Sequence, residues 1–135
     1  EFRRVLFRSR EGTDASIITY GYGVQWAFEL ADEYEKQGVS LEILDLRTLA
    51  PLDKEAIYQT VRKTNRVLLL QEPSITMGPM SEVSALINEH CFQYLDAPVL
   101  RAAPIDTPIP FNKKLEAGYL NLDGLKIQIE KLLGY

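Results

Sequence analysis

The chain has 135 residues, of which 46 % are apolar and 25 % charged, and this composition is typical of one folded domain. Its net charge of −4 argues against nucleic acid as the main partner, because phosphate binding needs clustered cations. One cysteine, Cys91, excludes an internal disulfide framework, and with the single histidine, His90, it leaves no plausible zinc site. No apolar run is long enough to span a bilayer.

The N-terminal stretch EFRRVLFRSR stands apart because it holds four of the fifteen basic residues. A transit peptide is also Arg-rich, but the acidic Glu1 and the short length fit one poorly. We interpret residues 1–10 as the start of a fragment or an arm introduced by cloning. We predict that residues 11–135 form the folded domain.

Strand-like and helix-like segments alternate along that domain. The first predicted strand, ASIITYG at 15–21, is β-branched, and the helix after it, at 24–38, has apolar residues at helical spacing. Residues 39–47 alternate as a strand does, and Asp53 is placed to cap a helix that extends to Arg62. The continuous apolar run RVLLLQE, at 66–72, predicts a strand that is covered on both faces.

The second half repeats this alternation. Residues 73–79 are predicted to form a loop, 80–92 a helix with Cys91 on its apolar stripe, and 97–103 a further strand. Residues 104–121 are proline-rich and are expected to be irregular, and Asp123 is expected to cap the last helix. Strands separated by helices imply an α/β fold, with a largely parallel sheet and helices on both of its faces.

A glycine pair after the first strand resembles a dinucleotide-binding turn. Gly21 and Gly23 precede the helix, and Asp45 ends the next strand, where an acid would bind a ribose. The third position of the pattern requires a small residue, whereas the chain has Trp26 there. We therefore favour a tight strand-to-helix turn over a free-standing nucleotide-binding module.

Four charged residues are expected at the carboxyl ends of the strands, where α/β sheets usually bind ligands. The four are Asp45, Arg47, Asp53 and Glu72. They could form an acid/base cluster, but a carboxylate beside an arginine has its pKa lowered, which does not suit general acid catalysis. We favour a structural corner, in which Arg47 pairs with Asp45 or Glu72 and Asp53 caps its helix.

His90 and Cys91 are adjacent on a predicted helix, so their side chains diverge by about 100° and cannot form a nucleophile–base pair. The serines have no second histidine to activate them. We therefore predict no catalytic, cofactor-binding or metal site in this chain.

Five segments, in order and at matching spacing, carry a resemblance to a known family. The segments are EGTDASIITYG, LEILDLRTLAPLD, VRKTNRVLLLQE, SEVSALINEHCFQYLDAPVLR and DTPIPF. From Glu11 to Tyr135 the chain resembles the C-terminal domain of the transketolase family, and most closely that domain in the β chain of 2-oxo acid dehydrogenase E1. It departs from the family pattern in having a single glycine, Gly78, followed by Pro79, where paired glycines are usual.

The resemblance implies a three-layer α/β/α sandwich around a five-stranded, mostly parallel mixed sheet. It also implies a non-catalytic domain for assembly and E2 docking, in an enzyme that decarboxylates a 2-oxo acid and transfers the acyl group to lipoyl-E2. Thiamine diphosphate and magnesium would bind in parts of the parent outside this chain, so the chain alone is expected to be inactive. The parent would be an oligomer, in the cytoplasm of a bacterium or the mitochondrial matrix of a eukaryote. The rival within the family is the C-terminal domain of transketolase or deoxyxylulose-phosphate synthase, against which DTPIPF and YLDAP argue.

Two candidate surfaces follow. In pyruvate-type relatives, the acid of the LDAP segment and the terminal residue face the subunit-binding domain of E2, which points here to Asp96 and Tyr135. The alternative is that Asp96 only begins a turn before Pro98 and that Tyr135 is a frayed terminus. A domain removed from its subunits also exposes its former interface. Four apolar residues in the loops 73–80 and 105–111 lack an obvious local core and are predicted to form such an interface: Ile75, Met77, Ile109 and Phe111.

Overall fold

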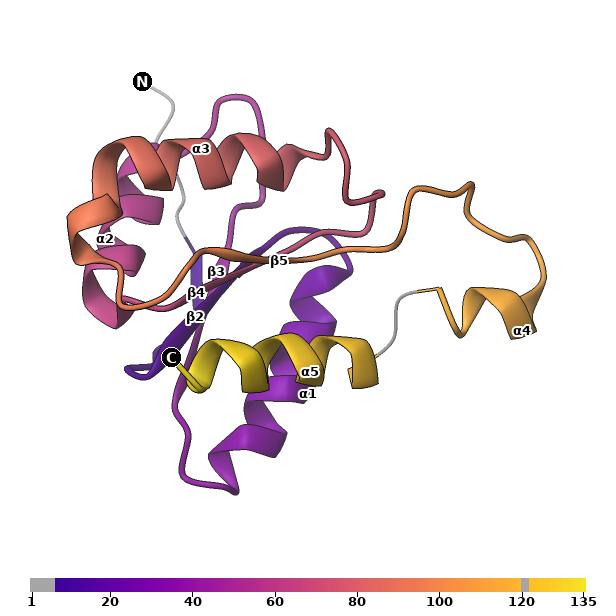
Figure 1. The fold of residues 1–135 in the computed structure, drawn as a ribbon, viewed down its shortest axis with the longest axis horizontal. Coiled ribbons are helices and arrows are strands. Elements are labelled where there is room, and N and C mark those ends of the chain that lie inside the picture. The colour runs from indigo at the N-terminus through magenta and orange to yellow at the C-terminus, as the bar shows by residue number, and fades with distance from the viewer. Residues whose placement is uncertain (1–6, 120–121) are drawn as a thin grey trace.

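The computed structural model describes residues 7–119 and 122–135, and these residues form a five-stranded sheet in the order β1-β3-β2-β4-β5 (Figure 1). Strand β1 pairs antiparallel with β3, and the remaining pairs are parallel. The strands are β1 Phe7–Arg10, β2 Ala15–Thr19, β3 Leu41–Asp45, β4 Val67–Leu70 and β5 Leu100–Ala102. The sheet is therefore mixed but mostly parallel, as expected from the alternation of elements.

Helices cover both faces of the sheet, with α1 and α5 on one side and α2 and α3 on the other (Figure 1). The helices are α1 Gly23–Glu35, α2 Lys54–Thr64, α3 Pro79–Cys91, the 3₁₀ turn η1 Phe92–Tyr94, α4 Lys113–Glu116 and α5 Leu122–Leu133. This arrangement confirms the predicted α/β/α sandwich.

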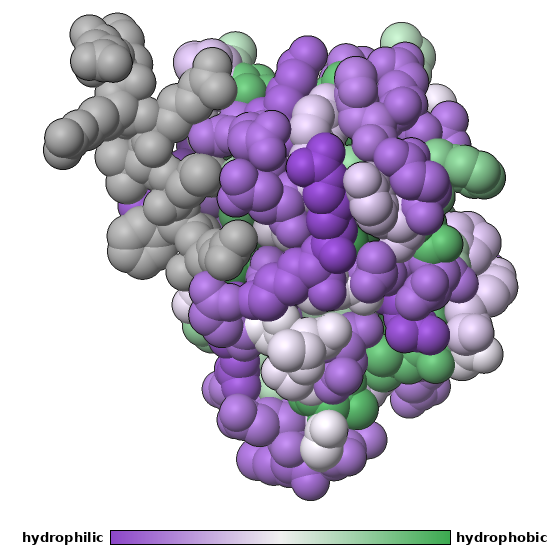
Figure 2. All heavy atoms as spheres, turned by 90° about the vertical axis from the view of Figure 1, so that its left-hand side faces the viewer, coloured by the Kyte–Doolittle hydropathy of each residue, from purple (hydrophilic) through white to green (hydrophobic). Residues whose placement is uncertain are grey.

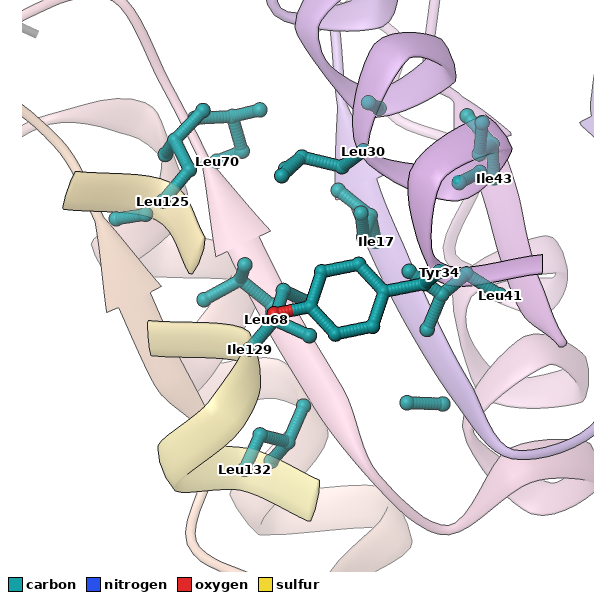
Figure 3. Close-up of a cluster of buried hydrophobic side chains, with 14 of the residues drawn as sticks. Ile17, Leu30, Tyr34, Leu41, Ile43, Leu68, Leu70, Leu125, Ile129 and Leu132 are labelled. Carbon is teal, nitrogen blue, oxygen red and sulfur yellow. The ribbon is translucent and has the colours of Figure 1, made fainter. Parts of the chain in front are cut away.

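Alternate residues of each inner strand enter the two layers of the core. Ile17 and Leu68 face α1 and α5, where the Tyr34 ring lies close to them and to Ile129 (Figure 3). The neighbouring residues, such as Leu69, face α2 and α3. Each fully buried Leu or Ile side chain stabilises the fold by about 1.5–3 kcal/mol, so the continuous apolar strands fix the three layers.

The ends of α2 follow from local chemistry. Asp53 caps the helix as predicted, because its Oδ1 accepts a hydrogen bond from Ala56 N at 3.1 Å. Asn65 ends the helix in the left-handed conformation, with φ of 60°. The helix therefore begins and ends close to where the sequence indicated.

Two expectations need correction. Residues 7–10, which the sequence places in an arm outside the domain, form the edge strand β1, and Arg10 anchors it to α1 by ion pairs with Asp32 at 2.5 Å and Glu35 at 3.0 Å. Asp123 lies inside the first turn of α5, which already includes Leu122, so it does not cap the helix. An acidic side chain in the first turn still interacts favourably with the helix dipole.

The segment predicted to be irregular contains one short helix, α4, whose start is capped by Asn112. In Figure 1 this segment extends from the end of β5, away from the sheet, and the chain then returns to α5. Residues 120 and 121 lie outside the described part of the chain.

Candidate functional surfaces

The charged corner after β3 has a structural role. Arg47 Nε lies 3.3 Å from Asp45 Oδ2, and the backbone N–H of Arg47 donates to Asp45 Oδ1 at 3.0 Å. This turn holds Arg47 at a positive φ of 54°, and Asp53 is engaged as the cap of α2. The geometry therefore favours the corner interpretation over an acid/base cluster.

Glu72 lies apart from that corner, at the start of α1. Its Oε1 accepts a hydrogen bond from the backbone N–H of Tyr22 at 2.7 Å. A Cβ at Gly21 would lie 2.9 Å from this oxygen, and one at Gly23 would lie 2.2 Å from Thr19 Oγ1. The positive φ of 59° at Gly21 and the close packing at Gly23 therefore explain the two glycines, and a carboxylate already lies at the helix N-terminus where a pyrophosphate would bind. The structure thus argues against nucleotide binding at this turn.

A buried amide organises the loop between β4 and α3, which the sequence did not reveal. Gln71 Nε2 donates to Ser74 O at 2.7 Å, and Gln71 Oε1 accepts from Met80 N at 2.9 Å. A Cβ at Gly78 would lie 1.9 Å from Gln71 Nε2, so this position needs glycine. Pro79 begins α3, where the missing N–H has no cost. The single glycine followed by proline therefore suits a loop built around Gln71.

The apolar loop surface, which we define as Ile75, Met77, Ile109 and Phe111, is largely exposed. Met77 is 92 %, Ile109 58 % and Phe111 105 % exposed, whereas Ile75 is half-buried. All four residues are therefore more exposed than the apolar residues of β2, β3 and β4, which are buried. Their role in an interface stays a prediction.

Hydrogen bonds hold the two loops of this surface together. Thr76 donates to Asp106 through its hydroxyl at 2.5 Å and its backbone N–H at 3.0 Å, and these bonds lower the pKa of Asp106. Arg101 Nη1 donates to Ile75 O at 3.0 Å and to Ser81 Oγ at 2.8 Å. These bonds thus join the loop that carries Ile75 and Met77 to the start of the loop that carries Ile109 and Phe111.

Asp96 lies on a groove of about 910 Å³ between α3 and the segment that follows η1. Its backbone N–H donates to Asn65 O at 2.9 Å, but within the described residues its carboxylate makes no hydrogen bond. The end of the molecule that carries η1 and the C-terminus is mostly hydrophilic, with small apolar patches (Figure 2). Tyr135 is exposed at that terminus. Both predicted E2-docking residues are therefore accessible, and their role is untested.

A buried charge in β3 was missed from the sequence. Glu42 is completely buried, and Lys63 of α2 pairs both with it and with Glu11. Hydrogen bonds to these two carboxylates raise the pKa of Lys63. Beside this pair, the buried hydroxyls of Ser16 and Thr64 are 2.6 Å apart. The cluster joins α2 to the sheet, and its buried position between them argues for a role in stability.

The remaining reactive groups do not form a site. Cys91 is buried, which raises the pKa of its thiol, and His90 is exposed with its ring against Tyr58 at 4.9 Å between centroids. In residues 7–119 and 122–135, no group of three or more His, Cys, Asp or Glu side chains could hold a metal ion. Nor is any helix in these ranges both long and apolar enough to cross a membrane.

The protein is a three-layer α/β/α domain with an exposed apolar surface on two hydrogen-bonded loops. Such a surface is expected of a domain that packs against another protein. The model of the transketolase C-terminal domain matches residues 6–123, so the chain belongs to this family.

Several curated relatives are β subunits of E1 components. The chain is 43 % identical over 125 residues to the 2-oxoisovalerate dehydrogenase subunit beta of Bacillus subtilis (strain 168), covering 91 % of this chain and 38 % of that protein. It is 48 % identical over 104 residues to the pyruvate dehydrogenase E1 component subunit beta of the same organism, covering 77 % and 32 %. The mitochondrial counterpart in Saccharomyces cerevisiae is 44 % identical over 109 residues, covering 79 % and 30 %. The chain thus spans about a third of the length of these relatives.

A solved structure gives the same fold. The chain of a split gene transketolase, described as an inactive beta4 tetramer, superposes with a TM-score of 0.81 at 25 % identity, covering 96 % of this chain and 41 % of that one. The fold and family predicted from the sequence are therefore confirmed.

Proposed function

We propose that this chain is the assembly and E2-docking domain of a thiamine-diphosphate-dependent 2-oxo acid dehydrogenase E1 component. The whole enzyme decarboxylates a 2-oxo acid and passes the acyl group to lipoyl-E2, and this domain contributes contacts and no catalytic group. One observation carries the proposal: Met77 and Phe111 project fully exposed from loops that hydrogen bonds hold in place. The relationship to E1 β subunits supports it.

The residues present do not fit thiamine diphosphate or its magnesium. The N-terminus of α1 is the position at a strand end where a diphosphate would bind, and the Glu72 carboxylate accepts the Tyr22 N–H there. The described carboxylates do not gather into a metal-binding group. We therefore assign the cofactor and its magnesium to other parts of the parent enzyme.

The assembly role can be tested by changing Phe111 to Ser in the complete β subunit. Because this ring makes little contact within the domain, the variant should melt within about 1 °C of wild type, as expected for a surface substitution. Its subunits should dissociate at higher protein concentration than those of wild type, as measured by sedimentation velocity. Ile127→Ser is a matched control, because Ile127 is also exposed but lies on α5. Wild-type association of the Phe111 variant would contradict the assembly role.

The docking role rests on the free carboxylate of Asp96 at the edge of the groove. A residue that only formed a turn before Pro98 would be expected to use its side chain in that turn, and Asp96 does not. Exposed negative charge on a hydrophilic surface suits a small basic partner, and such charges chiefly raise the association rate and specificity.

Asp96→Asn should weaken binding of the complete E1 to the E2 subunit-binding domain by about 1–3 kcal/mol, the range for a charge-assisted hydrogen bond. Surface charges are screened over about 10 Å at 0.1 M salt, so the difference should shrink at higher salt. Glu89→Gln, on an exposed acid of α3, is the charge-matched control. A variant that melts earlier yet binds E2 normally would leave Asp96 as a turn residue only.

A transketolase or deoxyxylulose-phosphate synthase parent is the second candidate, favoured by the structural match to a split gene transketolase. The reaction separates the two. We expect the complete protein to acylate lipoyl-E2 from a 2-oxo acid. Transfer of a two-carbon unit between sugar phosphates, without acylation of E2, would favour the second candidate.

A further inference from the structure

A second hollow, of about 370 Å³, lies beyond the carboxyl ends of β2, β4 and β5. Three aromatic residues line it: Tyr22 and Trp26 of the α1 region and Tyr119 after α4. Tyr22 and Trp26 meet edge to face, with their ring centroids 5.0 Å apart. Two carboxylates, from Glu72 and Glu116, complete its polar wall. We call this hollow the acidic aromatic cavity.

The lining of this cavity is suited to a cation. None of its lining residues is basic. Glu72 Oε1 accepts from Tyr22 N–H, while Glu72 Oε2 and the Glu116 carboxylate form no ion pair within the described part of the chain. A cation gains from carboxylate oxygens and from aromatic faces together. The cavity therefore presents two acceptors and three rings without the charge that would complement them.

The position of the cavity indicates where the cation comes from. Ile109, a member of the apolar loop surface, lines the cavity together with Pro104. The cavity therefore adjoins the surface that we assign to subunit assembly, and this step rests on that proposed function. A subunit that covered the opening would desolvate both carboxylates, which is costly unless a cation pairs with them. An interface at this place thus requires a basic group from the other side.

We propose that the acidic aromatic cavity receives an arginine side chain of a partner subunit. Its volume is at the low end of ligand pockets, which run from about 300 to 1,000 Å³, and this suits one side chain better than a dinucleotide. A guanidinium is planar, stacks on aromatic rings and bonds carboxylates with two N–H groups at once, whereas an ammonium is a compact, strongly hydrated point charge. Arginine and aromatic residues also dominate the energetics of protein interfaces.

The chain has one tryptophan, Trp26, so its fluorescence reports directly on this cavity. N-acetyl-argininamide, added to the chain, should produce a saturable change, and the neutral N-acetyl-glutaminamide should not. Glu72→Gln keeps an oxygen for the Tyr22 N–H but removes the charge, and Glu116→Gln removes the charge of the second carboxylate. Each should weaken binding by about three- to fivefold, the effect of one partly exposed ion pair. Glu82→Gln is the control, because Glu82 is an exposed acid of α3, on the other face of the sheet. This variant should bind N-acetyl-argininamide as wild type does.

The proposal is overturned if no saturable change occurs, if the neutral amide gives the same change, or if neither variant weakens binding. A second arm measures the assembly of the complete β subunit with both glutamates changed to Gln. If the chain binds N-acetyl-argininamide but this double variant assembles as wild type does, the partner-subunit origin is wrong. If the double variant assembles poorly while Phe111→Ser assembles normally, the arginine site stands and the apolar loop surface fails.

Discussion

Changing Lys63 to Met tests the buried charge cluster between β3 and α2. Glu42 is inaccessible to solvent, its Oε2 pairs with Lys63 Nζ, and its Oε1 has no hydrogen-bond partner among the described residues. Methionine keeps most of the apolar stem of lysine but removes the ammonium. The substitution would therefore leave a carboxylate buried without its counter-charge.

Removal of one member of a buried ion pair costs about 3–5 kcal/mol. The Lys63 side chain is 30 % exposed, and its other partner, Glu11, is exposed, so water can approach the pair from that side. We therefore expect a loss of about 2–4 kcal/mol, somewhat below the fully buried range. A domain of this size is stable by only about 5–15 kcal/mol, so the loss would be large.

The measurement is urea unfolding at pH 7 with an unchanged m value. Folding raises the pKa of Lys63 from 10.5, so its contribution is fully present below pH 10.5 and is lost as the pH rises through the folded value. The experiment at pH 7 therefore measures the whole effect. Glu11→Gln, which removes the exposed partner, should cost only about 0–1 kcal/mol.

A second variant separates the buried charge from simple packing. Glu42→Leu combined with Lys63→Met removes both charges, and replacing a buried pair with apolar residues is often neutral. The double variant should therefore recover most of the loss. A Lys63→Met variant within about 0.5 kcal/mol of wild type, the range of ordinary surface changes, would refute the reasoning.

Three further changes probe local features. Asp53→Ala should cost about 1 kcal/mol in urea unfolding, because Ala56 N loses its acceptor; an unchanged midpoint would mean that water replaces the cap. Gly23→Ala should cost about 1–3 kcal/mol, since its Cβ would lie 2.2 Å from Thr19 Oγ1, and a crystal structure without displacement of Thr19 would contradict this. Thr76→Val should raise the pKa of Asp106 towards 3.8, measured by NMR titration. A carboxyl group whose pKa is lowered by folding stabilises the folded state above its unfolded pKa, and this contribution is lost as the pH falls. The Thr76→Val variant should therefore lose less free energy of unfolding in acid than wild type does. The same loss in acid for both proteins would be evidence against the Thr76–Asp106 bond.

The three layers could be predicted from the sequence because the pattern of apolar residues that produces them lies within each strand and helix. The run at 67–70 is apolar at every position, which only a strand covered on both faces can bury, and β4 is buried at all four positions. The corner was also predictable, because Asp53 stands three residues before the N–H that it caps. These features depend on neighbours in the chain.

The features that were missed depend on partners far away in the chain. Glu42 lies between apolar residues of β3, and it is buried because α2 covers it with Lys63, 21 positions further on. The basic stretch at the N-terminus gave no strand signal, because β1 is held by pairing with β3 and by the contacts of Arg10 with α1. One signal was available: a lone acid in a strand with helices predicted on both faces needs a buried partner.

The position of Glu72 links the fold to the proposed assembly role. In an open α/β sheet, the crevice beyond the carboxyl ends of the strands usually binds a ligand, and helix N-termini there attract anions. Here Glu72, which follows β4, accepts a hydrogen bond from the backbone N–H of Tyr22, the residue before α1, so the anion position is occupied by a side chain of the same chain. The same carboxylate, with Glu116, gives the adjoining cavity a negative wall. The crevice that would hold a phosphate in a nucleotide-binding relative of this fold thus has the charge to attract a cation, which a neighbouring subunit can provide.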